Sequence, residues 1–463
     1  MQLSFPASNL TSIGHASVLG RVRIELDPQQ RSDFKSASSQ ELLRAASNGC
    51  VLSSFPLTKN QDVDSIEQAA IGWLNSSAEV VVLEGEEEIV AAVAERLPRA
   101  RVFYRVAQGL SLDNAATVLS TSLLNNAVGG FEVPIESQDG DEDKFVQACQ
   151  TLRDALKRDD DVNHGYGHGH STELFVVPTT EDFLSLPSSV AGRLDKIGVR
   201  ILLDGRLNIK GLPSSNASTS SSSEIENENT VRDVGLNLVG CLRTDRPDGL
   251  FATVVCDECG VALGLVYSSV ESIRESIQTG RGVYYSRSRK GLWRKGETSG
   301  AIQELVSISY DCDGDALRYV VRQLGSPPSF CHTGNRSCWG PSKGLRALQE
   351  VLQSRLASAP EGSYTRRLYN DEGLLRNKLL EEAQELSEAK ETDHVAAEAA
   401  DVIYFTLVAA VKGGASLEEI EGHLDRRTLK IKRRPGNAKP ERIAAAAAEL
   451  EAMRAAKRRK LEK

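Results

Sequence analysis

Residues that could bind metal ions cluster between Asp311 and Cys338. Aspartates stand at Asp311, Asp313 and Asp315 directly after a strand-like segment, so an extended chain would place their three carboxylates on one face. Three carboxylates make a hard oxygen site, which suits Mg²⁺. In the same extended chain Cys312 would face the opposite side, where a softer metal could use it.

Cys312, Cys331 and Cys338 together supply three thiolates, one fewer than a closed structural zinc site has. Zinc with an open fourth position lowers the pKa of its bound water to about 7, and the resulting hydroxide can attack an electron-poor carbon such as C6 of a purine. His332 stands beside a ligand and is a candidate for moving the proton. Since Cys312 faces away from the carboxylates, the zinc could form between two subunits, and a homodimer would follow. The alternative is a structural zinc knuckle beside a solvated turn.

A basic, hydroxyl-rich segment precedes these ligands and favours the enzymatic interpretation. Two arginines, a lysine, small hydroxyl residues and a glycine suit a phosphate cradle, with a tryptophan available for stacking or packing. A basic aromatic loop beside acidic ligands needs a metal ion to bridge them. The candidate substrate-binding residues are Ser286, Arg287, Ser288, Arg289, Trp293, Lys295, Gly296, Thr298 and Ser299.

At these residues the sequence resembles the phosphoribosyl-AMP cyclohydrolases. Four motifs follow one another in the family's order within residues 231–340: Ser-Arg-Ser-Arg, Leu-Trp-x-Lys-Gly-x-Thr-Ser-Gly, Asp-Cys-Asp-x-Asp and Cys-His followed by a second cysteine. The resemblance implies that the three aspartates bind Mg²⁺, that the three cysteines bind zinc across a dimer, and that His332 takes part in proton transfer. The implied reaction is hydrolytic opening of the adenine ring between N1 and C6, to the formimino-AICAR ribonucleotide.

A second group of carboxylates lies in a segment with helical periodicity. Glu382 and Glu385 stand three residues apart on one expected helix, and Glu398 and Asp401 three apart on the next, so each pair shares a helix face. If the helices pack antiparallel, four carboxylates converge on a Mg²⁺ site that can grip a triphosphate and orient an attacking water. Lys378 would neutralise a phosphate or pair with Glu382. The alternative is a solvated face, but apolar neighbours place these four nearer to a core.

This spacing resembles the all-helical nucleotide pyrophosphatases. The preceding Pro360-Glu-Gly-Ser-Tyr-Thr365 and Lys378-x-x-Glu-Glu narrow the resemblance to the phosphoribosyl-ATP pyrophosphohydrolases. The resemblance implies an ATP-binding domain that cleaves phosphoribosyl-ATP to phosphoribosyl-AMP and pyrophosphate. Phosphoribosyl-AMP is the substrate implied for the domain before it.

Because it carries both resemblances, the sequence is similar to the histidine-biosynthesis proteins that fuse these two activities, especially the fungal multifunctional form. In that form a histidinol dehydrogenase follows, so we expect this third activity to be absent or supplied by another chain. One alternative is a zinc nucleotide deaminase joined to a housecleaning pyrophosphatase, but the His-x-Glu and Pro-Cys-x-x-Cys motifs of deaminases do not occur. Another is a zinc-stabilised nucleotide- or nucleic-acid-binding scaffold.

These candidate residues must be positioned by helices and strands, and the pattern of these elements along the chain predicts a multidomain protein. Residues 1–212 alternate strands and helices, which predicts an α/β region with parallel strands and an unknown role, either a degenerate barrel fragment or a scaffold. A Ser/Asn/Glu-rich linker follows at 213–230. Residues 231–341 predict a mainly-β (α+β) metal-binding domain, 342–439 an all-α domain, and 440–463 an Ala-rich basic helical tail.

Individual elements follow from periodicity and from β-branched runs. We expect strands at 79–83, 102–104, 174–177 and 199–203, and helices at 89–97, 270–278, 343–357, 374–389, 394–411 and 417–429.

Composition indicates a soluble, cytoplasmic protein. The formal charge of −9 opposes broad nucleic-acid binding, and no apolar run approaches the roughly 20 residues of a membrane helix. No targeting segment is visible at the start. Five of the eight cysteines lie between Cys256 and Cys338, which favours metal binding or catalysis over disulfides.

Three further motifs receive a structural interpretation. The histidine-rich tract at 164–170 is expected to be a surface loop, with metal binding as the alternative. Cys256 and Cys259 form an isolated Cys-x-x-Cys, which is expected to be structural. The basic run at 457–460 is expected to lie on a solvated helix, with a nuclear signal as the alternative.

Overall fold

The computed structural model describes residues 2–6, 17–19, 21–26, 32–46, 49–57, 62–135, 141–156, 172–178, 188–204, 209–210, 232–325, 328–431 and 439–461. The histidine-rich tract and the expected linker lie outside these residues. The chain divides into two compact units, of which the first holds residues 1–339 with 428–432 and the second holds 340–427 with 433–463. Each unit is described by itself.

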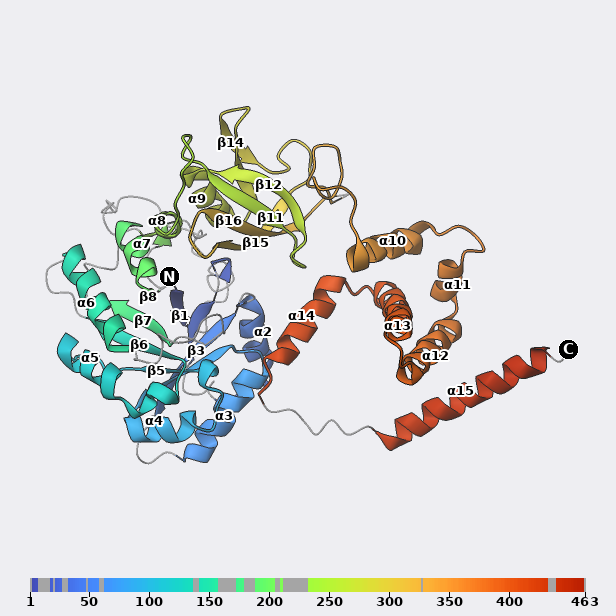
Figure 1. The fold of residues 1–463 in the computed structure, drawn as a ribbon, viewed down its shortest axis with the longest axis horizontal. Helices are drawn as coiled ribbons and strands as arrows, with labels where there is room; N and C mark the ends of the chain where they lie inside the picture. Colours follow the sequence, from blue (N-terminus) through green and yellow to red (C-terminus); the bar gives the residue numbers. More distant parts are fainter. Residues whose placement is uncertain are drawn as a thin grey trace, which may run out of the picture. The chain divides into compact units, whose positions relative to one another are not determined.

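The N-terminal region is a closed barrel of eight strands that pair in parallel and in chain order (Figure 1). The expected parallel α/β architecture is therefore confirmed, and the strands close a complete ring rather than a fragment. The strands are β1 (Gln2–Pro6), β2 (Val22–Glu25), β3 (Cys50–Leu57), β4 (Val80–Gly85), β5 (Val102–Arg105), β6 (Gly130–Ile135), β7 (Glu173–Pro178) and β8 (Val199–Asp204).

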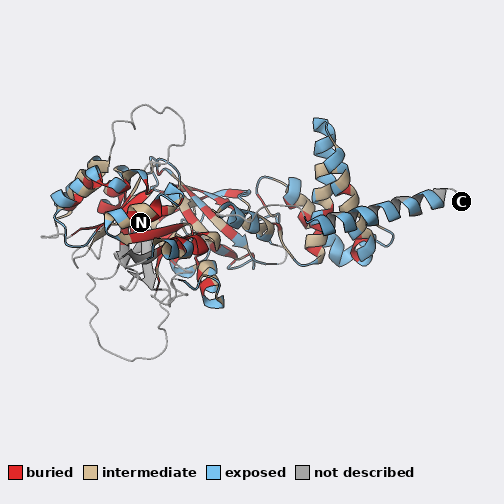
Figure 2. Cartoon of the chain, turned by 90° about the horizontal axis from the view of Figure 1, so that it is seen from below, coloured by how far each residue is buried: buried red, intermediate tan, exposed pale blue. Residues whose placement is uncertain are grey.

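Helices cover the outside of this barrel, as expected for strands joined by right-handed crossovers. They are α2 (Ala37–Ala45), α3 (Val63–Asn75), α4 (Glu87–Ala94), α5 (Leu112–Thr121), α6 (Glu142–Leu156) and α7 (Ser188–Lys196). Val81 and Leu83 pack with helix residues, whereas Val80 and Val82 belong to a separate cluster made only of strand residues. That second cluster is the barrel interior, so residues on both faces of β4 are buried. Figure 2 shows the buried residues of the chain in red.

Charged side chains also lie inside the barrel. Arg23 and Glu132 alternate with residues that face the helices, are 4% and 1% exposed, and form an ion pair of 3.1 Å between Nε and Oε1. Burial raises the pKa of Glu132, and Arg23 and Arg105 oppose that change. This interior polarity was not expected from the sequence.

The central domain is built on a six-stranded mixed sheet in the order β14-β13-β12-β11-β16-β15. All neighbouring strands are antiparallel except β11 and β16. The elements are α8 (Val234–Gly240), β11 (Phe251–Cys256), β12 (Ala262–Ser268), α9 (Val270–Thr279), β13 (Val283–Ser286), β14 (Gly291–Arg294), β15 (Gln303–Tyr310) and β16 (Ala316–Gln323), with β9 (Ile209–Lys210) pairing to β10 (Arg232–Asp233) before them. The mixed sheet with one covering helix agrees with the expected α+β class.

The second unit is all-helical, as expected. The most extensive helix–helix contact of this unit is between α12 and α13, and α10 and α11 also pack against α13. The elements are α10 (Gly344–Ser358), α11 (Tyr364–Asn370), α12 (Glu372–Glu388), α13 (Thr392–Lys412), α14 (Leu417–Thr428) and α15 (Pro440–Leu461). Helix α11 was not expected, because it is short and its Ser363 cap follows a Pro-Glu-Gly turn.

Among the described helices, α13 alone has a length and composition that would allow it to cross a membrane. This helix is an exception to the expectation that no apolar run approaches the length of a membrane helix. The core helix of a soluble protein passes the same test, and α13 carries Glu398 and Asp401 within the apolar stretch. Helix α13 packs against three other helices of the unit and buries Phe405, Leu407, Val408 and Val411, although only 22% of its apolar stretch is buried.

Candidate metal and nucleotide sites

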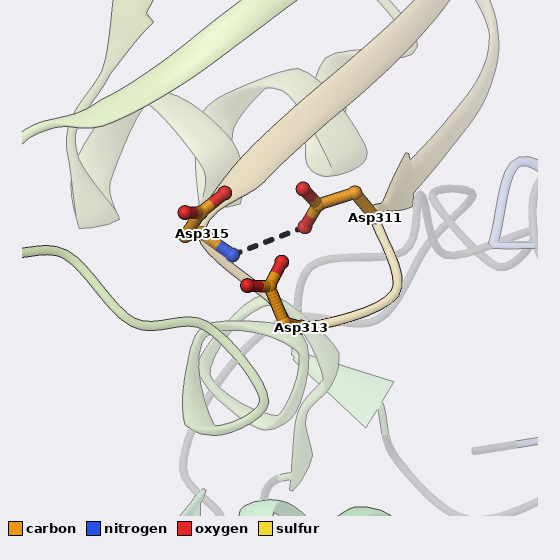
Figure 3. A group of neighbouring side chains, drawn as sticks. All are labelled: Asp311, Asp313 and Asp315. Atoms are coloured by element: carbon orange, nitrogen blue, oxygen red, sulfur yellow. Dashed lines mark hydrogen bonds between the residues drawn. The ribbon is translucent and has the colours of Figure 1, made fainter.

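The three central aspartates lie on the tight turn between β15 and β16 (Figure 3). One carboxylate oxygen from each of Asp311, Asp313 and Asp315 lies within 4.8 Å of the others. The segment is not extended, so alternation is not what brings the carboxylates together. Instead the chain reverses at Gly314, whose φ of +78° suits glycine and where a Cβ would lie 2.6 Å from the carbonyl oxygen of Cys241.

Backbone hydrogen bonds shape this turn. The Asp311 carboxylate accepts from the backbone N–H groups of Gly314 at 3.0 Å, Asp315 at 3.0 Å and Ala316 at 3.2 Å. Desolvation raises the pKa of Asp311, but these bonds outweigh it and the pKa lies below its ordinary value. A hydrogen bond with Asp311 and repulsion from Asp313 raise the pKa of Asp315. The donor set, exposed carboxylate oxygens that repel one another, fits a hard divalent cation.

Cys331 and Cys338 come together at the two ends of one loop after β16. Each of the two thiols influences the pKa of the other, so they lie near one another, and the Cys331 sulfur accepts from the Thr333 hydroxyl at 3.2 Å. The bond from Thr333 lowers the pKa of Cys331, whereas desolvation raises that of Cys338. His332 is exposed, with Nδ1 3.7 Å from the Cys331 sulfur.

The third expected thiol does not join this pair within one chain. Cys312 is exposed on the aspartate turn, and within the described residues no group of three metal-binding side chains contains Cys331 or Cys338. Two thiolates leave a tetrahedral zinc ion short of ligands. The arrangement therefore fits zinc only if a further ligand comes from elsewhere, as the expected interface site would require.

Lys295 lies in a different place from the other basic residues of its motif. Its side chain is buried, and Nζ donates to the carbonyl oxygens of Ala301 at 3.3 Å and Ser329 at 3.4 Å. Burial lowers the pKa of Lys295, and the nearby Cys338 and Cys331 oppose this change. Lys295 thus lies against Ser329 and the ring of Phe330, in the segment that leads into Cys331.

The remaining basic residues form the hairpin between β13 and β14. Arg287 and Arg289 are exposed, and neither has a carboxylate partner within the described part of the chain. The Arg287 guanidinium stacks on the ring of Tyr267 at 4.1 Å from its centroid, and Arg246 lies 4.5 Å from the same centroid. Stacking holds the Arg287 guanidinium with its N–H groups free for an anion.

Other members of the expected phosphate cradle have local roles. The Ser286 hydroxyl contacts Ser288 at 3.3 Å and accepts from the backbone N–H of Arg289, so these serines shape the hairpin. Trp293 packs on Tyr284 at a centroid distance of 5.8 Å, which favours packing over stacking on a ligand. Thr298 and Ser299 are exposed on the following turn, where Gly296 has a φ of +85° and a Cβ would lie 2.4 Å from Ala301.

In the helical unit, α12 and α13 bring Glu382, Glu385 and Glu398 together, with one oxygen from each within 4.8 Å of the others. Glu382 is 5% exposed, and the Glu398 side chain is 15% exposed. The Glu398 Oε2 atom is buried with no hydrogen-bond partner in the part of the chain that the structure describes. A buried carboxylate oxygen without a partner is costly, so these three glutamates fit the binding of a cation.

Two basic side chains, Lys378 and His394, lie beside the glutamate cluster. Lys378 pairs with Glu382 at 2.5 Å and Glu381 at 2.8 Å, so it neutralises a glutamate, one of its two expected roles. Burial lowers the pKa of Lys378, but these two bonds outweigh it and raise the pKa overall. His394 lies 3.2 Å from Glu398. Desolvation raises the pKa of Glu385, and Glu382 adds to this.

Asp401, the fourth expected carboxylate, lies one turn after Glu398 on α13. It is exposed and outside the group of three. The geometry within one chain does not bring Asp401 to the other three carboxylates, so its role as a metal ligand stays a prediction.

The two sites fall in regions with known relatives. The family model for phosphoribosyl-AMP cyclohydrolase matches residues 264–340, and that for phosphoribosyl-ATP pyrophosphohydrolase matches residues 345–428. The histidine biosynthesis bifunctional protein HisIE of Pyrococcus furiosus is 35% identical over 198 residues, which span 40% of this chain and 93% of that protein. This chain belongs to the bifunctional histidine biosynthesis family. Its aspartate turn and thiol pair lie in the first matched region, and its glutamate cluster lies in the second.

Fungal relatives of the family are similar over more of the chain. A histidine biosynthesis trifunctional protein of Komagataella pastoris is 39% identical over 384 residues, or 83% of this chain and 39% of that protein. A bifunctional protein of Schizosaccharomyces pombe is 52% identical over 196 residues, or 42% of this chain and 46% of that protein. The chain thus spans less than half the length of these two relatives. The Komagataella match is longer than everything after the barrel, so it includes part of the barrel.

Residues distant in sequence complete the sites, and sequence reasoning missed them. Arg246 and Tyr267 support Arg287, and Asp257 pairs with Arg336 inside the Cys331–Cys338 loop. A pairwise contact of this kind leaves no spacing signal in a single sequence.

Proposed function

We propose that the chain catalyses two consecutive hydrolyses of histidine biosynthesis. The helical unit would cleave phosphoribosyl-ATP to phosphoribosyl-AMP and pyrophosphate, and the central domain would open the adenine ring of phosphoribosyl-AMP between N1 and C6. The observation that carries the proposal is the convergence of Glu382, Glu385 and Glu398, with a buried oxygen left unpartnered, inside the region that matches the pyrophosphohydrolase family. The cyclohydrolase region directly precedes it.

For the first reaction, the three glutamates would hold Mg²⁺. A Mg²⁺ ion held by these carboxylates would supply charge neutralisation for the triphosphate and orientation for an attacking water. The Lys378 ammonium lies 2.5 Å from the Glu382 carboxylate, where it would hold that carboxylate in place beside the cation. His394 is placed to orient Glu398.

For the second reaction, Cys331 and Cys338 would hold zinc, with Cys312 supplied by a second copy, and the three aspartates would hold Mg²⁺. Zinc held by these thiols would supply a lowered pKa for the water that attacks the ring. His332 is exposed beside a thiol ligand, where it can take up a proton from water or deliver one to the ring. A homodimer and a cytoplasmic location belong to this proposal.

Arg287 offers a test of substrate binding at the hairpin. We expect Arg287→Ala to raise KM for phosphoribosyl-AMP by about 10-fold to 100-fold, because a stacked guanidinium with free N–H groups is lost. Steady-state ring opening measures this. Arg294→Ala is the matched control, since Arg294 is exposed on the same hairpin but already paired with Glu275. An equal rise in KM for both variants would contradict a specific role of Arg287.

The decisive experiment supplies phosphoribosyl-ATP to the purified chain with Mg²⁺ and Zn²⁺ and follows the products by chromatography. We expect phosphoribosyl-AMP and pyrophosphate first and the formimino product afterwards. A scaffold that only binds nucleotides would leave phosphoribosyl-ATP intact, and that result would refute the proposal.

A further inference from the structure

The loop that carries the thiols rests on a turn that the proposed reaction does not use. We name residues 331–338 the thiol loop and residues 256–261, between β11 and β12, the Cys-x-x-Cys turn. The thiol loop is closed by backbone bonds, in which Asn335 O accepts from the N–H groups of Phe330 at 3.1 Å and Cys331 at 3.0 Å. At its far end, Cys338 N donates to Leu263 O at 2.8 Å.

One side chain connects the turn to the loop. Oδ1 of Asp257 accepts from the backbone N–H groups of Cys259 at 3.1 Å and Val261 at 2.9 Å, which shapes the turn. Its other oxygen, Oδ2, accepts from Nη2 of Arg336 at 2.8 Å. Asp257 is 2% exposed, and Arg336 stands in the loop between the two cysteines.

The surroundings restrict how the loop can sit. Gly264 of β12 leaves room for Phe330, since a Cβ there would lie 2.3 Å from the phenyl ring. Gln323 donates to Arg336 O at 3.2 Å, so the loop is also tied to β16. Among these contacts, only the pair of Asp257 with Arg336 joins two opposite charges in a largely buried place.

We propose that Asp257 is a positioning residue for the zinc site. It holds Arg336, and through Arg336 the thiol loop, so that Cys331 and Cys338 present their sulfurs to one metal ion. The proposal rests on the proposed function, in which these two cysteines bind zinc. Two thiolates repel each other before the metal arrives, and a loop held from outside loses less conformational freedom when zinc binds.

The competing view is that Asp257 only stabilises its own turn. The two carboxylate oxygens separate these roles, because Asp257→Asn keeps an oxygen acceptor for the turn but removes the charge that binds Arg336. Glu258→Ala is the matched control. Glu258 is the adjacent carboxylate and pairs with Arg322 on the sheet surface, at 3.0 Å between Nε and Oε2, without touching the thiol loop.

The test uses the full chain and two readouts. Competition with a chromophoric chelator measures zinc affinity, and hydrogen exchange of the metal-free chain measures protection of the Phe330, Cys331 and Cys338 amides. We expect Asp257→Asn to weaken zinc binding by about 10-fold to 100-fold, as for other partners of metal ligands, and to speed exchange of these amides. Glu258→Ala should change neither. At saturating zinc, ring opening by Asp257→Asn should recover with KM for phosphoribosyl-AMP unchanged.

The outcomes separate the two proposals. If the unsubstituted chain binds zinc and Asp257→Asn binds it equally well, the positioning role is refuted while the proposed function stands. If saturating zinc fails to restore ring opening, weak zinc binding is not the cause of the loss and the positioning role is again refuted. If the unsubstituted chain binds no zinc, the proposed zinc site at Cys331 and Cys338 is refuted, and the positioning role of Asp257 is refuted with it.

Discussion

Glu398→Gln is expected to abolish pyrophosphate release from phosphoribosyl-ATP while ring opening of added phosphoribosyl-AMP continues. Glu398 joins Glu382 and Glu385 from the neighbouring helix, and its buried Oε2 has no other partner among the described residues. An amide keeps the shape but removes the charge that a cation needs. We expect a loss of about 100-fold or more in kcat, roughly 3 kcal/mol, because metal ions contribute several kcal/mol to such transition states. A coupled pyrophosphate assay measures it.

Two further variants sharpen this result. Glu388→Gln removes an exposed carboxylate one turn after Glu385 and should leave pyrophosphate release unchanged. Asp401→Asn tests the fourth expected ligand, which lies outside the cluster in one chain. A loss for Asp401→Asn as large as for Glu398→Gln would show that the metal site includes Asp401. Equal losses for Glu388→Gln and Glu398→Gln would contradict the site.

Cys338→Ser is expected to do the reverse, stopping ring opening while pyrophosphate release continues. A serine hydroxyl is a poor zinc ligand at neutral pH, so the chain should lose bound zinc. Without zinc, water near the substrate keeps its ordinary pKa, and we expect ring opening to fall about 1,000-fold or more. Chromatography of the products and zinc content per chain measure the two effects.

Cys259→Ser is the control for this variant. Cys259 lies half-buried in the Cys-x-x-Cys turn, and the interpretation of that motif as structural predicts unchanged zinc content and ring opening. Loss of zinc from both variants would contradict that interpretation. Loss of both hydrolytic activities from Cys338→Ser, in a chain that remains folded, would refute separate sites.

The fold classes could be predicted because each rests on a local pattern. In the barrel, Val80 to Leu83 are buried on both faces, so a continuous β-branched run predicts a strand of a parallel sheet. Closure of eight strands into a ring could not be predicted, because it depends on β1 pairing with β8 across nearly two hundred residues. Nor could the ion pair of Arg23 with Glu132 inside the ring, since both look like ordinary surface residues in the sequence.

The candidate sites show the same division. Glu382 and Glu385 share a helix face by the helical period, so their proximity followed from spacing. The three central aspartates also converge, but by a different route from the extended chain that alternation suggested. Reversal at Gly314 and backbone bonds to Asp311 bring them together, and these depend on how β15 and β16 pair.

The sequence by itself determined the chemistry available to this protein, because residue types and short spacings set which metals and phosphates can bind. It placed thiols, carboxylates and arginines in two regions that match two hydrolase families. Only the tertiary structure decided which of them meet. It put Lys295 against Ser329 and Phe330 before the thiol loop, left Cys312 outside any metal-binding group with Cys331 and Cys338 among the described residues, and joined Asp257 to Arg336. The physical reason is that such contacts depend on strand pairing and packing between residues far apart in the chain, which no local period encodes.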